Sequence, residues 1–364
     1  MSEQIFAAPG RIEIGGNHTD HQHGRVLTAA INLKTICKAV INNLNIIKID
    51  SAGFGRTKID LNDLVPRSEE KGKPASLIRG VAAWLKSNGH NIGGFDGKIS
   101  SSLPAGAGLS SSAAFEILIA KVLSGLYKLN ISQRDMAIAG QYAESVYFGK
   151  PCGLMDQMAS SFGGLMMIDF YDSENPLIRP IDIKFSGYEI CVVNTGGSHA
   201  DLTSDYTSVF EEMKNIAGYF GKSVLREVAP ETFYKNIKGL RRFGDRAVLR
   251  AAHFFGENAR VLKQANALEA ENIDEFLKLV REAGISSLEY LQNVYSVSSP
   301  NRQGLTLALW LSEKVLGGEG AFRVHGGGFA GTILAFIPES LKTEYQQNMS
   351  NVFGENCCCF LKVV

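Results

Sequence analysis

The sequence predicts a globular protein of two domains in which β-strands and α-helices are mixed. Three observations lead to this expectation. The chain has 364 residues, which exceeds the usual size of one domain, about 100–200 residues. Runs of β-branched residues separated by turns fill its first hundred residues, and long helical patterns follow them. The strand pattern then begins again near Tyr188, so we expect a domain boundary near residue 189.

Composition and charge exclude several classes of protein. Apolar residues make up 45% of the chain, enough for a sizeable core, so wholesale disorder is not expected. Lysine plus arginine number 37, as do aspartate plus glutamate, and this neutral balance argues against a nucleic-acid partner. No run reaches the roughly 18 apolar residues of a membrane span, and the first residues lack the features of a signal peptide. We therefore expect a soluble, cytoplasmic protein with neither a membrane nor a nucleic-acid partner.

The six cysteines are expected to be free thiols. They are Cys37, Cys152, Cys191 and the run Cys357–Cys359. Adjacent cysteines rarely bridge each other, and no CxxC spacing indicates a zinc or redox site. Free cysteine packs as a small hydrophobic residue, so most of these side chains are expected to be buried.

The first half of the chain carries signals for strands and then for helices. Three runs rich in β-branched residues predict strands: Val26–Ile31, Thr35–Ile41 and Ile46–Ile49. Apolar residues recur at helical spacing over three later segments: Ser76–Ser87, Ser110–Leu129 and Gln133–Phe148. The last of these helices stops before Gly149 and Pro151, residues that commonly end helices.

The second half begins with a predicted strand at Tyr188–Asn194 and continues as helices to Leu316. Two further strands, Ala321–His325 and Thr332–Ile337, are expected around a cluster of glycines. This cluster, Gly326–Gly331, formally matches GxGxxG and raises the alternative of a dehydrogenase. A dinucleotide-binding loop must open a helix, however, whereas the following residues predict a strand. The match is therefore weak.

The segment Pro104–Ser112 is the most informative one for function. Its glycines let the backbone approach an anion closely, and its serines are expected to cap the helix that follows. A phosphate at this position meets amide donors and the positive end of the helix dipole. An ordinary turn with a serine cap is the alternative. The residues of the predicted phosphate-binding loop are Gly106, Ala107, Gly108, Leu109, Ser110, Ser111 and Ser112.

A second dense group of polar residues lies near the start of the chain. Two polar segments lie between short apolar runs, which favours a binding loop: Ala8–Arg11 and Gly15–Gly24. The histidines and the aspartate of this group also allow a metal site, but the fixed ligand spacings of zinc sites are missing. Farther along, Glu144 and Asp156 are candidate functional carboxylates. Taken alone, Glu144 fits a solvated helix face, and Asp156 fits a helix cap just after a glycine turn.

Taken together, these segments resemble one family. Ala8–Leu27, Pro104–Ala113 and Arg323–Thr332 are similar to three blocks of the GHMP small-molecule kinases and occur in the same order. Cys152–Gln157 is similar to a block of the galactokinase branch. The resemblance spans nearly the whole chain, and four ordered motifs are more specific than any single one. It implies an α+β fold of two lobes with the active site between them: a ribosomal protein S5 domain 2-like domain over 1–189 and a ferredoxin-like domain over 190–364.

The resemblance also implies a role for each matching residue. Asp156 corresponds to the catalytic carboxylate near the anomeric hydroxyl of the sugar, and Arg11 beside it stabilises the transferring phosphoryl group. Ser111 and Glu144 correspond to the ligands of Mg²⁺. ATP and Mg²⁺ are thus the expected cofactors, and phosphorylation of galactose at its anomeric hydroxyl is the expected activity. The positions that correspond to sugar contacts are Asn17, His18, Asp20, Gly153, Asp156 and Tyr206.

Three positions depart from the family pattern. Asn17 stands where the family usually has glutamate, His21 where it has tyrosine, and Val209-Phe210 where it tends to have paired arginines. In the family the glutamate binds the sugar near C6, so a neutral Asn17 removes a charge that repels a C6 carboxylate. A kinase of galacturonic acid or of another galacto-configured sugar is therefore the alternative.

Two further expectations follow from the resemblance. A catalytically silent sugar and ATP sensor is a more distant alternative, because Arg11, Glu144, Asp156 and the serines of the loop are all present. The resemblance implies a monomer or a weak homo-oligomer whose partners are a small sugar and ATP.

Overall fold

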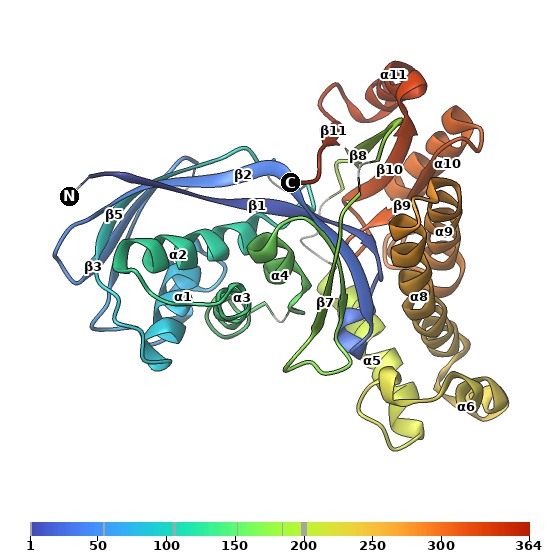
Figure 1. Ribbon diagram of the computed structural model, residues 1–364. Coiled ribbons are helices and arrows are strands. Elements are labelled where there is room, and N and C mark those ends of the chain that lie inside the picture. Colours follow the sequence, from blue (N-terminus) through green and yellow to red (C-terminus); the bar gives the residue numbers. More distant parts are fainter. Residues whose placement is uncertain (1, 54, 105–106, 151, 184, 198–201) are drawn as a thin grey trace.

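Two sheets organise the chain, one in each half of the sequence (Figure 1). The structure, a computed structural model, describes residues 2–53, 55–104, 107–150, 152–183, 185–197 and 202–364. The strands of the first sheet are β1 (Gln4–Gly15), β2 (Arg25–Ile41), β3 (Ile46–Ser51), β4 (Gly55–Asp60), β5 (Phe95–Ser101), β6 (Leu165–Asp169) and β7 (Leu177–Ile181). Those of the second sheet are β8 (Tyr188–Asn194), β9 (Ala321–His325), β10 (Thr332–Pro338) and β11 (Cys358–Leu361).

Strand β2 is the centre of the first sheet. β1 runs antiparallel along one side of it, whereas β5 and β6 share its other side. The order of the sheet is β4-β3-β5-β2-β6-β7, with β1 also paired to β2. The two strands predicted between residues 26 and 41 are therefore one. Asn32 does not interrupt this strand because its N–H donates to the Lys362 carbonyl at 2.9 Å.

Strand β1 corrects the expectation of a binding loop at Ala8–Arg11. These residues lie inside the strand, and its register shifts between Pro9 and Arg11. Such a bulge lets a strand hold a proline, which cannot donate to the ladder. At Gly10 a Cβ atom would lie 2.4 Å from Leu103 Cδ2 and 2.8 Å from the Leu109 carbonyl oxygen. Glycine is thus required where the phosphate-binding loop packs on β1.

Helices cover one face of the first sheet (Figure 1). They are α1 (Pro74–Ser87), α2 (Ser111–Tyr127), α3 (Gln133–Tyr142) and α4 (Met155–Phe162). Both α2 and α4 contact β1 and β2. The helix predicted over Gln133–Phe148 forms as α3 followed by the π-helix η3 (Ala143–Phe148). π-Helical turns are rare and are frequent at functional sites.

The second sheet is antiparallel and has the order β11-β8-β10-β9. Helix α8 (Asp245–Glu269) contacts β1 and β2 of the first sheet. A single apolar cluster joins Ile12 and Leu27 to Val261 and Phe276. The fold is therefore α+β, as expected. The division at residue 189 stays a prediction, since β8 begins there but the two halves share this core. The helices of the second half are α5 (Thr203–Tyr219), α6 (Pro230–Lys235), α7 (Ile237–Leu240), α8 (Asp245–Glu269), α9 (Ile273–Ser286), α10 (Gly304–Leu316) and α11 (Lys342–Phe353).

Three smaller expectations can be checked against the fold. All six cysteines are free thiols, and Cys37, Cys191 and Cys357 are buried. The glycine cluster Gly326–Gly331 precedes strand β10 and not a helix, which is the wrong context for a dinucleotide-binding loop. Within the described ranges, no helix is long and apolar enough to cross a membrane.

Candidate active site

An arginine–aspartate pair lies at the centre of the predicted site. Arg11 comes from β1 and Asp156 from the first turn of α4. Arg11 Nε donates to Asp156 Oδ1 at 2.6 Å and Nη2 donates to Oδ2 at 2.9 Å. This bidentate geometry is the strongest form of such a pair. The Asp156 side chain is still 27% exposed, so it can meet a ligand.

The charge state of Asp156 follows from its neighbours. Burial by itself raises the pKa of this carboxyl, but the Arg11 guanidinium and two side-chain hydrogen bonds outweigh burial and lower it below its usual value. One of these bonds comes from Arg11 and the other from the Ser110 hydroxyl, which donates to Oδ2 at 2.5 Å. Asp156 is therefore a carboxylate throughout the neutral pH range.

The phosphate-binding loop packs against this pair. Arg11 Nη1 donates to the Gly108 carbonyl at 2.7 Å, and the Arg11 N–H donates to the Leu109 carbonyl at 3.2 Å. Ala107 and Leu109 are buried, while Gly106 lies outside the described residues. The first turn of α2 begins directly after Ser110 and presents amide groups that lack a partner within the helix.

The expectation that a serine side chain caps α2 is wrong. Ser110 has the left-handed backbone angles φ 56° and ψ 55° and makes no side-chain cap. Its hydroxyl instead donates to Asp156. The loop is thereby tied to the carboxylate of α4, so the place of a bound phosphate and the place of Asp156 are fixed together.

Strands β9 and β10 of the second sheet hold the loop from the other side. A Cβ atom at Gly108, where φ is +66°, would lie 2.8 Å from Thr332 Oγ1. His325 Nε2 accepts from the Glu13 N–H at 3.0 Å, and Nδ1 lies 3.1 Å from Thr332 Oγ1. Burial holds the pKa of His325 well below its usual value. The ring is therefore neutral, with its proton on Nδ1, and links β1 to Thr332 at the start of β10.

Glu144 forms a second acidic centre, held by the π-helix η3. Its Oε1 accepts from the Ser112 hydroxyl at 2.9 Å and from Lys150 Nζ at 3.2 Å. Its Oε2 accepts from Gln157 Nε2 at 2.9 Å. Ser111, the serine expected beside Glu144, is exposed instead, and no hydrogen bond links it to Glu144. The structure thus brings Ser112 to this carboxylate.

A third carboxyl group, Glu116 of α2, lies behind Glu144. It is fully buried and accepts from Gln157 Nε2 at 3.0 Å. Burial, followed by the charge of Glu144, raises its pKa well above the usual value, which favours the protonated form. Its Oε1 lacks a hydrogen-bond partner among the described residues, as does Gln157 Oε1. Sequence reasoning missed both residues; the position of Gln157 next to Asp156 was the available signal.

The predicted sugar residues meet at the segment between β1 and β2. Burial raises the pKa of Asp20 to about 6. A Cβ atom at Gly153 would lie 2.0 Å from Asp20 Oδ2, so these two positions are in direct contact. His18 Nε2 lies 2.9 Å from the Gly327 carbonyl. Tyr206 of α5 donates to the Gly328 carbonyl at 3.1 Å. The predicted sugar site is thus formed by both halves of the chain: Asp20 and His18 come from the first half, and Tyr206 comes from the second.

Asn17 is placed differently from the other predicted sugar residues. It is 1% exposed. Its Nδ2 donates to Glu13 Oε1 at 3.0 Å and to the Gly326 carbonyl at 2.6 Å, while its Oδ1 accepts from Asn293 Nδ2 at 2.8 Å. A primary amide has two N–H donors, and both are used within the protein. A sugar contact of this side chain stays a prediction.

Two other departures from the family pattern contact each other. The His21 and Phe210 rings pack edge to face with their centroids 5.5 Å apart. His21 Nε2 also lies 3.3 Å from His18 Nδ1. Burial, and then the charge of His18, lowers the pKa of His21 to about 3, so this ring is neutral. The side chains of His21 and Phe210 are therefore uncharged at the positions that depart from the family pattern, and the Lys214 ammonium group lies 5.8 Å from the centroid of the Phe210 ring.

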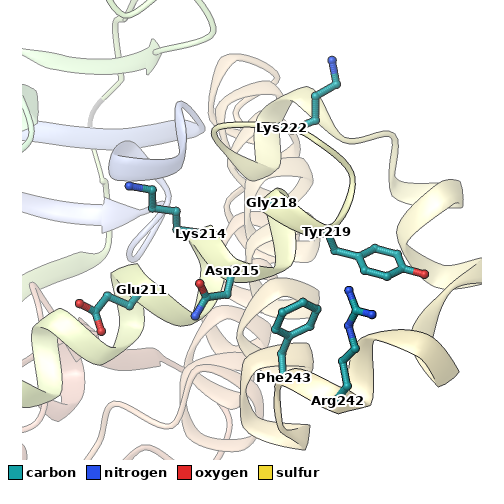
Figure 2. A pocket seen from close by; sticks show the side chains of 8 residues that line it. All are labelled: Glu211, Lys214, Asn215, Gly218, Tyr219, Lys222, Arg242 and Phe243. Carbon is teal, nitrogen blue, oxygen red and sulfur yellow. The ribbon is translucent and has the colours of Figure 1, made fainter.

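A separate hollow of about 660 Å³ lies on the outer side of α5. Figure 2 shows Tyr219, Phe243 and Arg242 close together there, while the ammonium groups of Lys214 and Lys222 point away from them. The Arg242 guanidinium lies 4.9 Å from the centroid of each ring. None of the predicted site residues lines this hollow, so it does not belong to the candidate active site.

An anion-binding loop at a helix start, an ionised Arg–Asp pair and a second acidic centre define the site of a small-molecule kinase. Comparisons with known proteins agree. Residues 76–164 match the model of the GHMP kinases N terminal domain, and residues 1–39 match that of the galactokinase galactose-binding signature. A galactokinase of Glaesserella parasuis is 32% identical over 359 residues, which cover 97% of this chain and 91% of that protein. The chain belongs to the galactokinase family.

Solved structures agree with this placement. The structure is similar to that of Lactococcus lactis galactokinase complexed with galactose, with a TM-score of 0.87 and 25% identity; the match covers 100% of this chain and 94% of that chain. Methanococcus jannaschii mevalonate kinase has a TM-score of 0.70 at 15% identity, over 100% and 99% of the two chains. The second likeness concerns the fold alone.

Proposed function

We propose that this protein transfers the γ-phosphoryl group of ATP to the anomeric hydroxyl of galactose. The observation that carries this proposal is the Arg11–Asp156 pair. It joins an ionised, partly exposed carboxylate to the loop that presents amide donors at the start of α2. A sugar hydroxyl on Asp156 and a phosphate on the loop would therefore be neighbours.

Asp156 acts on the sugar in this account. Its carboxylate accepts a hydrogen bond from the anomeric hydroxyl and directs an oxygen lone pair at the γ-phosphorus. A carboxylate with a lowered pKa is a weak base, so it takes the proton only as the new O–P bond forms and the bond to the leaving phosphate breaks. His18, Asp20 and Tyr206 surround the remaining hydroxyls.

Arg11 acts on the transferring group. Its side chain is fixed by Asp156 and by the Gly108 carbonyl, so its positive charge is in place before the reaction begins. Such a preorganised charge stabilises the negative charge that spreads over the phosphoryl oxygens in the transition state. The amide groups at the start of α2 add to the same effect.

The second acidic centre fits Mg²⁺. This ion prefers carboxylate, hydroxyl and phosphate oxygens. The Glu144 carboxylate and the Ser112 hydroxyl provide such donors 2.9 Å apart, and the unpartnered Glu116 Oε1 lies behind them. Glu144 with Ser112 would hold the ion, in place of the expected pairing with Ser111. When bound, Mg²⁺ neutralises phosphate charge.

Galactose is favoured over galacturonate by three neutral side chains at the sugar site. Burial is the main cause that lowers the pKa of both His18 and His21, which favours the neutral form of each ring. Together with Phe210, they therefore offer no cation that would bind a C6 carboxylate. These three side chains also include no carboxylate that would repel one. Galacturonate is therefore the second sugar to test.

A coupled assay of ADP release tests the proposal. Galactose, galacturonate, glucose and a blank without sugar are compared, each with and without Mg²⁺. We expect the highest kcat/KM with galactose and release that depends on sugar. Turnover of galacturonate without turnover of galactose would contradict the assignment of the sugar. Binding of galactose and ATP without any ADP release would indicate a sensor.

A further inference from the structure

Lys150 contacts the active site, although no role was expected for it. It follows Gly149, the residue that caps the C-terminus of η3 with φ +86°. The Lys150 N–H donates to the Glu144 carbonyl at 3.1 Å, and Nζ donates to Glu144 Oε1 at 3.2 Å. Main chain and side chain therefore both tie Lys150 to Glu144. The Lys150 side chain is nevertheless 63% exposed, whereas that of Glu144 is 2% exposed.

Lys150 balances the charge of Glu144. A buried carboxylate is costly without a counter-ion. Burial lowers the pKa of Lys150, but Glu144 and Asp156 outweigh burial and raise it, so its side chain is an ammonium ion. Ser112 and Gln157, the other donors to the Glu144 carboxylate, are neutral.

The ammonium group of Lys150 and a divalent cation compete for the same oxygen. Ser112 and Lys150 both donate to Glu144 Oε1, the oxygen that faces the proposed Mg²⁺ position. Two cations on one carboxylate oxygen repel each other. Lysine has a flexible stem of four carbons, so an exposed lysine can leave its partner without moving the backbone.

On Glu144 Oε1 the ammonium group lies beside the phosphate-binding loop, because Ser112 of that loop donates to the same oxygen. The charge of Lys150 acts on Asp156, which accepts from Ser110 of that loop. It also acts on Tyr206, where burial raises the pKa to about 12 and Lys150 opposes that rise. A phosphate chain bound at that loop would therefore offer the displaced ammonium group an anionic partner nearby.

We propose that Lys150 is a mobile counter-ion: it neutralises Glu144 until a divalent cation binds there, and it then contacts the phosphate chain of the nucleotide. This inference rests on the proposed function, since it assumes that Glu144 holds the metal ion. It predicts two effects of opposite sign when the ammonium group is removed. Metal binding without nucleotide becomes tighter, and nucleotide binding becomes weaker.

Binding measurements on the full chain test both effects. Mn²⁺ binding to the nucleotide-free protein is followed by electron paramagnetic resonance, and ATP binding in the presence of saturating Mg²⁺ by calorimetry. Lys150→Met should bind Mn²⁺ about threefold more tightly, the scale of a half-exposed ion pair. It should bind ATP about tenfold more weakly, as expected for loss of a hydrogen bond to a charged group. Lys150→Arg should keep most of the ATP affinity.

Lys71→Met is the matched control. Lys71 is exposed, and its Cδ lies 3.5 Å from where a Cβ of Gly149 would be, but no hydrogen bond or ion pair links it to Glu144. This variant should change neither affinity. Unchanged Mn²⁺ affinity or unchanged ATP affinity in Lys150→Met overturns the proposal.

The variant Glu144→Gln distinguishes an error in the role of Lys150 from an error in the position of the metal site. If Glu144→Gln abolishes Mn²⁺ binding while Lys150→Met changes neither affinity, only the role of Lys150 is wrong. If Glu144→Gln binds Mn²⁺ as the wild type does, the metal site itself is wrong, and the role of Lys150 is wrong with it.

Discussion

Replacing Asn17 by aspartate exchanges one amide nitrogen for oxygen and changes little else. In the native protein this nitrogen donates to Glu13 Oε1 at 3.0 Å and to the Gly326 carbonyl at 2.6 Å. After Asn17→Asp, oxygen faces both acceptors inside the protein. The Gly326 carbonyl loses its partner, whereas Glu13 Oε1 keeps the bond from Arg323 Nη2 at 2.7 Å but faces a second carboxylate. One buried group without a partner costs about 1–3 kcal/mol, and a charged group costs more, so the free energy of unfolding should fall by about 2–4 kcal/mol. That is a large part of the roughly 5–15 kcal/mol typical of a domain.

Urea denaturation followed by circular dichroism measures this loss. Asn42→Asp is the matched control, because Asn42 Nδ2 also donates to a carbonyl, that of Ile46 at 3.0 Å, and to a carboxylate, Asp96 Oδ1 at 2.7 Å. Asn42 is only half-buried, so water can replace its lost partners, and the control should lose about 1 kcal/mol or less. An equal loss in the two variants would refute the reasoning that Asn17 is committed to the protein interior.

Two further predictions concern the sugar site. Burial raises the pKa of Asp20 to about 6, so protonation below pH 6 removes a charged acceptor of sugar hydroxyls. The kcat/KM for galactose should therefore fall by up to about tenfold per pH unit below pH 6. An Asp20→Asn variant with the same pH profile as the wild type would contradict this prediction. Gly153→Ala places a methyl group 2.0 Å from Asp20 Oδ2. The KM for sugar should rise by about tenfold or more, while the Kd for ATP stays unchanged. An unaltered KM would show that sugar binding does not depend on the contact between Gly153 and Asp20.

The functional motifs could be predicted from the sequence, whereas their detailed contacts could not. Arg11, Asp156 and the loop around Gly108 lie in short segments whose residue types indicate their chemistry. The serine that reaches Glu144 depends on where α2 begins: because the helix starts at Ser111, Ser112 contacts η3 and Ser111 is exposed. A run of three serines does not contain this information.

Local patterns also failed where tertiary contacts decide the backbone. Pro9 and Gly10 indicate a turn, but they lie in β1 because a bulge accommodates the proline and the loop at Leu109 presses on the glycine. The contacts of Gln157 with Glu116 and Glu144 join α2, η3 and α4. Their partners are 41 and 13 residues away in the chain, so no periodicity within one element predicts them.

The rate of phosphoryl transfer in Asp156→Asn tests the central claim most directly. The variant keeps the shape of the side chain and removes its charge. We expect kcat to fall by about 10²-fold or more, the usual effect of removing one preorganised group, with the Kd for ATP unchanged. Asp169→Asn is the matched control, because Asp169 pairs with Arg25 and Arg226 away from the loop; its kcat should stay within about twofold of the wild type. A kcat of Asp156→Asn close to that of Asp169→Asn would contradict the assignment of Asp156 to the reaction.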